Sequence, residues 1–258
     1  MKNNNTTKLI FFAILFFGVF GVAESSQAAT VNATSCSQAD VQAAINSATA
    51  GDTVLVPAGS CTWTTGNGTT CWGGYTVGVC VKKGIKLQGG NGGSSTITFG
   101  SGFTRGGLQI FPDASSLSGN ATFEITGFTF DGNNQSMNNE GLLSIRSSTT
   151  NILYNLKIHD NIFKNVTNKA LVVNGAVNGV IYKNTFTDVA YSVVAYGGDA
   201  YGWATFTRDY GQADNLFVED NTINFTTDMS DVGGTDHGQG APGFVFRYNT
   251  FNLANTRG

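Results

Sequence analysis

Groups that could move a proton are concentrated in the second half of the chain. His237 follows Asp236 within the glycine-rich segment 232–243 (VGGTDHGQGAPG). An imidazole titrates near neutral pH, so His237 is suited to take up or release a proton during a reaction. Two arginines, Arg146 and Arg208, are the other candidate bases. The sequence therefore predicts an acid–base site formed by Asp236, His237, Arg208 and Arg146.

One long segment combines aromatic rings with charged groups. Residues 197–212 (GGDAYGWATFTRDYGQ) contain Tyr201 and Trp203 together with Asp199 and Asp209. A sugar ring has apolar C–H faces and a rim of hydroxyl groups, which flat aromatic side chains and polar groups can bind. The predicted sugar-binding residues are Asn174, Tyr196, Asp199, Tyr201 and Trp203, and the candidate metal ligands are Asp199, Asp209 and Asp236.

A repeated pattern indicates which elements must position these residues. Four segments share the pattern apolar-x-x-Asn-x-(Phe/Ile), with asparagines that recur after 23, 37 and 28 residues. Apolar and polar residues alternate within each copy, which is typical of a half-buried strand, and no copy contains an amphipathic helix. A fifth segment, 125–130, carries Phe128 at the asparagine position. The spacing predicts successive coils of a parallel β-solenoid. The repeated asparagines are Asn161, Asn184, Asn221 and Asn249.

We interpret these asparagines as structural. Each coil must turn sharply between two short strands, which favours a residue that tolerates the left-handed backbone conformation. The side-chain amide can also bond to the asparagine of the next coil, about 4.8 Å away. The repeats therefore predict a ladder of asparagines instead of catalytic amides.

Other segments fit the same architecture. Ser37 and Asp40 are spaced as at the start of a short helix, with Val41, Ala44, Ile45 and Ala48 on one face. Such a helix can cover the exposed strands at the end of a solenoid. The segments 53–57, 84–89 and 95–99 are predicted short strands.

Composition excludes several classes of protein. The chain has 258 residues, only 12% of them charged, and a formal net charge of −3. A nucleic-acid-binding protein would be more basic, and a disordered chain would not be 41% hydrophobic. Residues 9–22 are apolar but too few to cross a hydrocarbon core of about 30 Å comfortably, and small residues follow at Ser26 and Ala28. We predict a signal peptide over 1–28, a secreted or cell-surface domain over 29–258, and no membrane span after cleavage; an uncleaved anchor is the alternative.

The chain has four cysteines, all in the first quarter of the predicted mature protein. An even number of cysteines in an exported protein indicates disulfides, and three pairings are possible. The favoured pairs are Cys36–Cys61, which ties the N-terminal segment to a strand, and Cys71–Cys80, which closes a glycine-rich excursion. A zinc site is the rival interpretation, but the spacing lacks CxxC and no histidine is near.

These features together resemble a known family. The run ADVQAAINSATAGDTVLVPAGSCTW, then KKGIKLQGGNGG and STITF, and then the NxF copies are similar to secreted right-handed parallel β-helix proteins of the pectate-lyase-like superfamily. The resemblance covers about Ser35 to Asn252. It implies an all-β fold, a right-handed parallel β-helix (solenoid) with a short N-terminal capping helix. The chain ends at Gly258 in the middle of a predicted coil, so we expect either a fragment or an end that a partner caps.

The resemblance also implies where a site would lie. In such solenoids the asparagine turn joins the second and third strands of a coil, which makes 142–146, 170–174 and 192–196 first strands. Their outward positions are expected to form two columns, one of Ser144, Val172 and Val194 and one of Arg146, Asn174 and Tyr196, with Asp236–Gly238 arriving beside the second. Outward columns on the second strands, one of His159, Tyr182, Glu219 and Arg247 and one of Asp160, Lys183 and Asp220, are interpreted as structural charge pairs.

The chemistry that the resemblance implies is β-elimination on an acidic polysaccharide. In the resembling enzymes a cation, usually Ca²⁺, neutralises the sugar carboxylate, and an Arg, Lys or His removes the neighbouring proton. The family signatures of pectate lyases and polygalacturonases are absent from this chain. A glycoside hydrolase, which needs two or three carboxylates at fixed separations, and a non-catalytic glycan-binding or adhesin-like protein are the alternatives.

Overall fold

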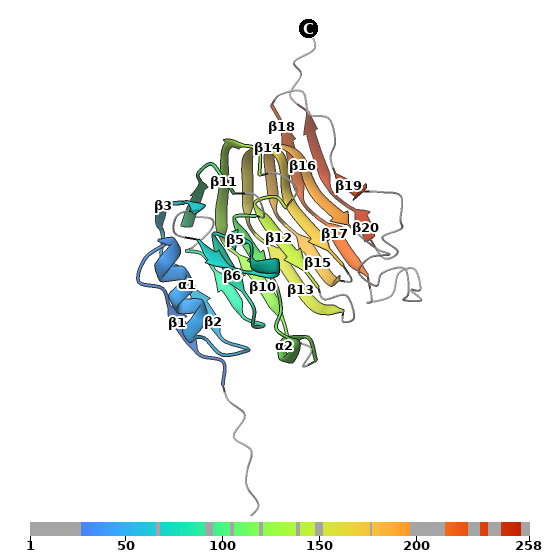
Figure 1. Cartoon of the computed structure of the whole chain (residues 1–258). Helices are drawn as coiled ribbons and strands as arrows, with labels where there is room; N and C mark the ends of the chain where they lie inside the picture. The colour runs from blue at the N-terminus through green and yellow to red at the C-terminus, as the bar shows by residue number, and fades with distance from the viewer. Residues whose placement is uncertain are drawn as a thin grey trace, which may run out of the picture.

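The computed structural model describes residues 27–65, 68–90, 95–103, 106–118, 121–137, 140–147, 152–175, 177–196, 215–226, 233–236 and 244–253. Most of these residues lie in two large parallel β-sheets (Figure 1). Among the described residues, no helix has the length and apolar character needed to cross a membrane. The predicted signal peptide lies outside the described residues except for its last two positions.

The first sheet has eight strands, all paired in parallel. Its strand order follows the order of the chain, although segments of the other sheet intervene. In that order the strands are β1 (Thr30–Asn32), β2 (Thr53–Leu55), β7 (Lys86–Gln88), β10 (Phe123–Thr126), β13 (Leu153–His159), β15 (Val177–Tyr182), β17 (Leu216–Glu219) and β20 (Phe244–Arg247).

The second sheet has eleven strands, and its pairings are also parallel. One path runs β3 (Gly59–Trp63), β8 (Ser95–Phe99), β11 (Phe128–Gln135), β14 (Ile162–Asn174), β16 (Thr185–Tyr196), β18 (Thr222–Phe225), β21 (Thr250–Leu253). The other runs β6 (Val79–Val81), β9 (Leu108–Ile110), β12 (Leu143–Arg146), then the C-terminal halves of β14 and β16, then β19 (Gly233–Asp236).

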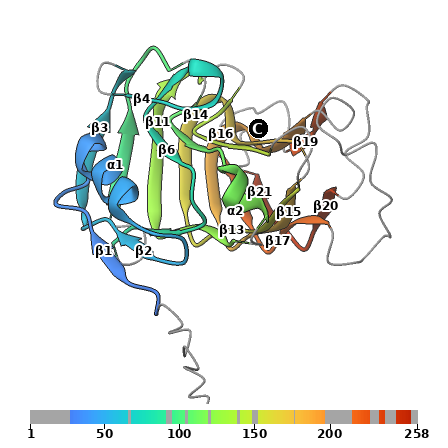
Figure 2. The ribbon, with the colours of Figure 1, turned by 60° about the horizontal axis from the view of Figure 1, so that its bottom comes forward.

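The chain alternates between the two sheets, and each strand pairs with its counterpart one repeat later. Figure 2 shows the two sheets facing one another. Apolar side chains from both sheets form the core between them. Equivalent positions stack: the ring centroids of Phe130 and Phe163 are 5.3 Å apart, and those of Phe163 and Phe186 are 5.1 Å apart. Stacked offset rings stabilise each other beyond the burial of their surface. This all-β arrangement of long parallel sheets is compatible with a parallel β-helix.

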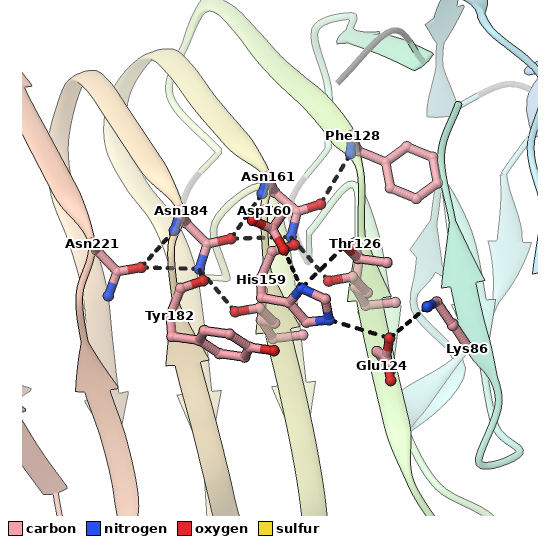
Figure 3. A network of polar contacts seen from close by, with 12 residues as sticks. Lys86, Glu124, Thr126, Phe128, His159, Asp160, Asn161, Tyr182, Asn184 and Asn221 are labelled. Atoms are coloured by element: carbon pink, nitrogen blue, oxygen red, sulfur yellow. Dashed lines mark hydrogen bonds and ion pairs between the residues drawn. The ribbon is translucent and has the colours of Figure 1, made fainter. Parts of the chain in front are cut away.

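The four repeated asparagines lie in one file, of which Figure 3 shows Asn161, Asn184 and Asn221. The Nδ2 of Asn161 donates to Oδ1 of Asn184 at 3.1 Å, Asn184 donates likewise to Asn221 at 3.0 Å, and Asn221 to Asn249 at 2.9 Å. The backbone N–H of Phe128 donates to Oδ1 of Asn161 at 3.1 Å, so the copy without asparagine ends the file. This is the arrangement that the repeats predict.

The expected backbone conformation of these asparagines is wrong by one residue. The left-handed conformation falls on the residue before each asparagine: Asp160, Lys183, Asp220 and Tyr248 have φ between 52° and 56°. In the fifth copy Gly127 has φ 81° at that position. The asparagine is therefore selected for its amide, which bonds the neighbouring coils, while the preceding residue makes the turn.

The N-terminal segment is tied down by a helix and disulfides. Helix α1 (Gln38–Ser47) begins after Ser37, whose hydroxyl accepts the backbone N–H of Asp40 at 3.3 Å. Its apolar face is buried at one end of the stack, next to β1 and β3. Cys36 is bonded to Cys61 and Cys71 to Cys80, the two pairings that the spacing favours. The excursion closed by Cys71–Cys80 contains η2 (Trp72–Gly74) and β5 (Thr76–Val77), and β5 pairs in antiparallel with β4 (Thr69–Thr70), which precedes it. Helix α2 (Ala114–Ser118) follows β9.

Candidate functional site

Four of the predicted site residues lie side by side on neighbouring strands. Arg146 at the end of β12 is paired with Asn174 of β14, Asn174 with Tyr196 of β16, and Tyr196 with Asp236 of β19. Parallel strands are about 4.8 Å apart, so the row brings together residues that are distant in sequence. We call Arg146, Asn174, Tyr196 and Asp236 the strand-end row. The adjacent row, two residues earlier, is formed by Ser144, Val172, Val194 and Gly234.

The described side chains of these two rows are covered. Arg146 is 4% exposed, Asn174 is 5% exposed, and Ser144, Val172 and Val194 are also buried. Part of the cover is the disulfide-closed excursion, because the Trp72 ring centroid lies 3.8 Å from Cζ of Arg146. A guanidinium stacks well on an aromatic face. The excursion has no repeat, so periodicity could not indicate that it folds back over the row.

A buried glutamate that the sequence analysis missed holds the row together. Glu140 is 3% exposed, and its Oε2 accepts Ser144 Oγ at 2.9 Å and Asn174 Nδ2 at 3.1 Å. Its Oε1 accepts the Nη2 of Arg146 in an ion pair. Two buried opposite charges compensate one another only when their hydrogen bonds are satisfied, as they are on this carboxylate. The sequence gives only a weak indication of this role, because Glu140 stands in a polar segment two residues before the predicted strand 142–146.

The polar network continues toward the excursion. Nε2 of Gln109 lies 3.4 Å from Ser144 Oγ, and Oε1 of Gln109 accepts the backbone N–H of Trp72 at 3.2 Å. Hydrogen bonds therefore connect the excursion to the row through Gln109 and Ser144. Among the described residues, Nε of Arg146 is buried without a hydrogen-bond partner.

This geometry redefines the role expected for Arg146. A base needs a free lone pair, but a guanidinium stays protonated in proteins, and this one is paired with Glu140 beneath a tryptophan. Arg146 and Asn174 are thus fixed in place by one carboxylate. They are suited to position other groups at the end of the row.

The remaining predicted residues lie outside the part of the chain whose side chains the structure describes. For Tyr196 and Asp236 the backbone alone is placed, in the strand-end row. Asp199, Tyr201, Trp203, Arg208, Asp209 and His237 are outside the described residues. By connectivity, segment 197–214 follows Tyr196 directly, and His237 follows Asp236.

The outer face of the eight-stranded sheet carries a second polar network (Figure 3). Nε2 of His159 is 3.2 Å from Oε1 of Glu124, and Lys86 Nζ is 3.0 Å from the same oxygen. Nδ1 of His159 is 2.6 Å from Oδ2 of Asp160 and 3.3 Å from the Thr126 hydroxyl. Both ring nitrogens of His159 are therefore engaged.

The pKa of Glu124 shows the balance of these contacts. Partial burial raises it, whereas the hydrogen bonds and positive charges of Lys86 and His159 lower it, and the net effect is a pKa below its usual value. The ring of Tyr182 stacks on His159 with centroids 4.8 Å apart. Burial, followed by the charges of Asp160 and Glu124, raises the pKa of Tyr182.

The outward column on these strands has the expected register. Thr126, His159, Tyr182, Glu219 and Arg247 are successive cross-strand neighbours, and Glu219 accepts Nε of Arg247 at 2.8 Å. Arg247 also lies 4.7 Å from the Phe217 ring centroid. The pairing of Glu219 with Arg247 agrees with a structural interpretation of this column.

Within the described ranges, no three His, Cys, Asp or Glu side chains are grouped so that they could hold a metal ion. The candidate ligands Asp199, Asp209 and Asp236 have side chains outside those ranges.

Comparison of the chain with models of protein families, and with curated proteins, produced no match.

Proposed function

We propose that the chain is a secreted right-handed parallel β-helix of the pectate-lyase-like type that acts on an acidic polysaccharide, with β-elimination as its chemistry. The observation that carries the proposal is the strand-end row, in which Arg146, Asn174, Tyr196 and Asp236 are cross-strand neighbours. The two disulfides suit an oxidising, extracellular environment.

The row supports the proposal because two of its residues directly precede segments of the sequence that contain predicted site residues. In the sequence, His237 comes directly after Asp236, and the aromatic segment 197–212 comes directly after Tyr196. Rigid strands that carry adjoining loops are where proteins commonly bind ligands. Glu140 fixes Arg146 and Asn174 in place, so the described part of the row is held firmly.

The elimination would proceed by general acid–base chemistry. His237 removes the proton from the sugar carbon that bears the carboxylate. The adjacent ring carbon then loses its bond to the glycosidic oxygen, and a double bond forms between these two carbons. An acid group returns a proton to the leaving oxygen. In the resembling enzymes Ca²⁺ makes that first proton more acidic. The described residues form no calcium site, so we derive no step through a metal ion.

The test is to incubate the secreted protein with pectate, alginate and chondroitin, with and without Ca²⁺. Unsaturated products absorb in the ultraviolet, so absorbance should rise with at least one of these polymers. His237→Ala should abolish the rise without altering the circular dichroism spectrum. Turnover that survives this substitution would remove His237 from the site, and no rise with any polymer would reject elimination.

A specific observation also favours a second candidate, a glycan-binding protein without catalysis. The described part of the row is a closed cluster in which the charges of Glu140 and Arg146 neutralise each other. A glycoside hydrolase would need catalytic carboxylates on this face, and Glu140 is a carboxylate there. Both of its oxygens, however, already accept hydrogen bonds from Arg146, Ser144 and Asn174. Retention on a pectate column without product formation would identify the binding function.

A further inference from the structure

A groove lies on the outer face of the eight-stranded sheet, away from the strand-end row on the other sheet. It has a volume of about 510 Å³ and is lined by Lys86, Glu124 and Lys157 and by Thr53, Gly51 and Thr122, with small apolar residues beside them. The groove crosses strands β2, β7, β10 and β13, which are consecutive in the sheet. Its polar side chains therefore come from four repeats that are adjacent only in the folded chain.

The charged residues of the groove form one straight row. Thr53 is paired with Lys86, Lys86 with Glu124, and Glu124 with Lys157. With strands about 4.8 Å apart, the two lysines are separated by about 10 Å along the stack. Lysine, glutamate and lysine thus alternate at regular intervals across the groove.

The groove has an excess of positive charge. Glu124 is 16% exposed and already interacts with Lys86 and His159. Lys157 is exposed, and no ion pair with it occurs among the described residues. An exposed ammonium in a concave polar site, beside one compensated carboxylate, is suited to bind an anion.

Glycines keep the groove open. At Gly51, φ is +93°, and an added Cβ would meet no atom within 4 Å, so the space above it is empty. At Gly84 an added Cβ would approach the Cβ of Ala121 to 2.3 Å, so only glycine permits this close packing. The absence of a side chain at Gly51 therefore leaves room for a ligand beside the charged row, whereas Gly84 lets two turns of the groove wall pack closely.

We propose that this groove binds the carboxylate-bearing units of an acidic polysaccharide, with Lys157 and Lys86 contacting carboxylates and Glu124 and Thr53 contacting sugar hydroxyls. The two lysines, about 10 Å apart along the stack, suit carboxylates on two units of the polymer, and the hydroxyl groups of the sugar between them suit Glu124. The ligand class rests on the proposed function, but the site is separate from the strand-end row and needs no catalysis.

The test measures the affinity of the full secreted protein for polygalacturonate by affinity electrophoresis at low ionic strength. Lys157→Gln should weaken binding about tenfold, the size expected when a charge-assisted hydrogen bond is lost. Glu124→Gln, which removes the only negative charge lining the described groove, should tighten binding several-fold. The matched control is Lys183→Gln, an exposed lysine on a turn outside the groove, which should change the affinity by less than about twofold.

Further arms separate this inference from the proposed function. His237→Ala should abolish unsaturated products while the Lys157-dependent affinity persists, because the two sites lie on different sheets. Melting temperatures equal to that of the wild type would show that each variant keeps its fold. If Lys157→Gln and Lys86→Gln both bind polygalacturonate like the wild type, the groove is not the binding site. Equal loss with Lys183→Gln, or equal affinity for a single-stranded oligonucleotide of matched charge, would also overturn the proposal.

Discussion

At the scale of single residues, the stability of the strand-end row depends on one buried ion pair. Arg146 lies under Trp72 and cannot reach water, so the carboxylate of Glu140 supplies its counter-charge. The exposed pair of Glu219 and Arg247 has similar chemistry, but water solvates both groups. We therefore expect the buried pair of Glu140 and Arg146 to matter strongly for stability, and the pair of Glu219 and Arg247 to contribute little.

These two pairs give a matched comparison. Glu140→Ala should lower the free energy of unfolding by about 3–5 kcal/mol, because it leaves a buried guanidinium without a counter-charge. Glu219→Ala should lower it by less than about 1 kcal/mol. Urea denaturation of both variants measures the difference. Equal small losses would show that Arg146 does not depend on Glu140.

Glu124 makes a pH-dependent contribution to stability. Its pKa is lowered in the folded state, so the carboxylate stabilises the fold above its usual pKa, and this contribution is lost as pH falls through the lowered pKa. Glu124→Gln removes the contribution. The wild type should therefore be more stable than the variant by about 1 kcal/mol near pH 6, and the difference should shrink toward about pH 3. Thermal unfolding across this range measures it, and a difference that stays constant with pH would contradict the assignment.

At the scale of elements, the asparagine file joins consecutive coils. Asn184 donates to the backbone carbonyl oxygens of Ile158 and Tyr182 and to Oδ1 of Asn221. It accepts from Asn161, so one side chain connects three successive repeats. The repeated pattern made this file predictable, since each asparagine stands at the same place relative to its strand. The resemblance to parallel β-helix proteins implied that 142–146, 170–174 and 192–196 are neighbouring strands, and β12, β14 and β16 do end in register.

A substitution within the file measures its contribution. Asn184→Ala should lower the free energy of unfolding by about 2–4 kcal/mol, because it leaves buried backbone groups without partners. Asn46→Ala, at an exposed position of α1, should change it by less than about 0.5 kcal/mol. Chemical denaturation compares the two variants. A comparable effect of both would mean that the file is not a stabilising element.

At the scale of the whole molecule, the sequence predicts the repeating parts and fails where the chain departs from the repeat. Stacked strands and the asparagine file follow from the repeated pattern, because equivalent residues of successive copies lie on neighbouring strands. The strand-end row follows from the resemblance to parallel β-helix proteins. The cover over Arg146 does not, since it depends on how the Cys71–Cys80 excursion folds back. The groove was also missed, because Lys86 and Glu124 precede the asparagine repeats and their alignment with Lys157 is a property of the sheet. Tertiary contact between non-repeating segments leaves no periodic signal in a sequence.

The central claim is that equivalent positions of successive repeats are stacked along one axis. Spin labels at Gln88 and, in turn, at Tyr182, Glu219 or Arg247 would test it by electron paramagnetic resonance distances in solution. These positions lie three, four and five strands apart in one outward column, so the distance should increase by about 4.8 Å at each step. The labels are separated by 37 and then 28 residues, yet the two increments should be equal. Unequal increments, or distances that do not increase, would contradict the stacked arrangement and with it the site.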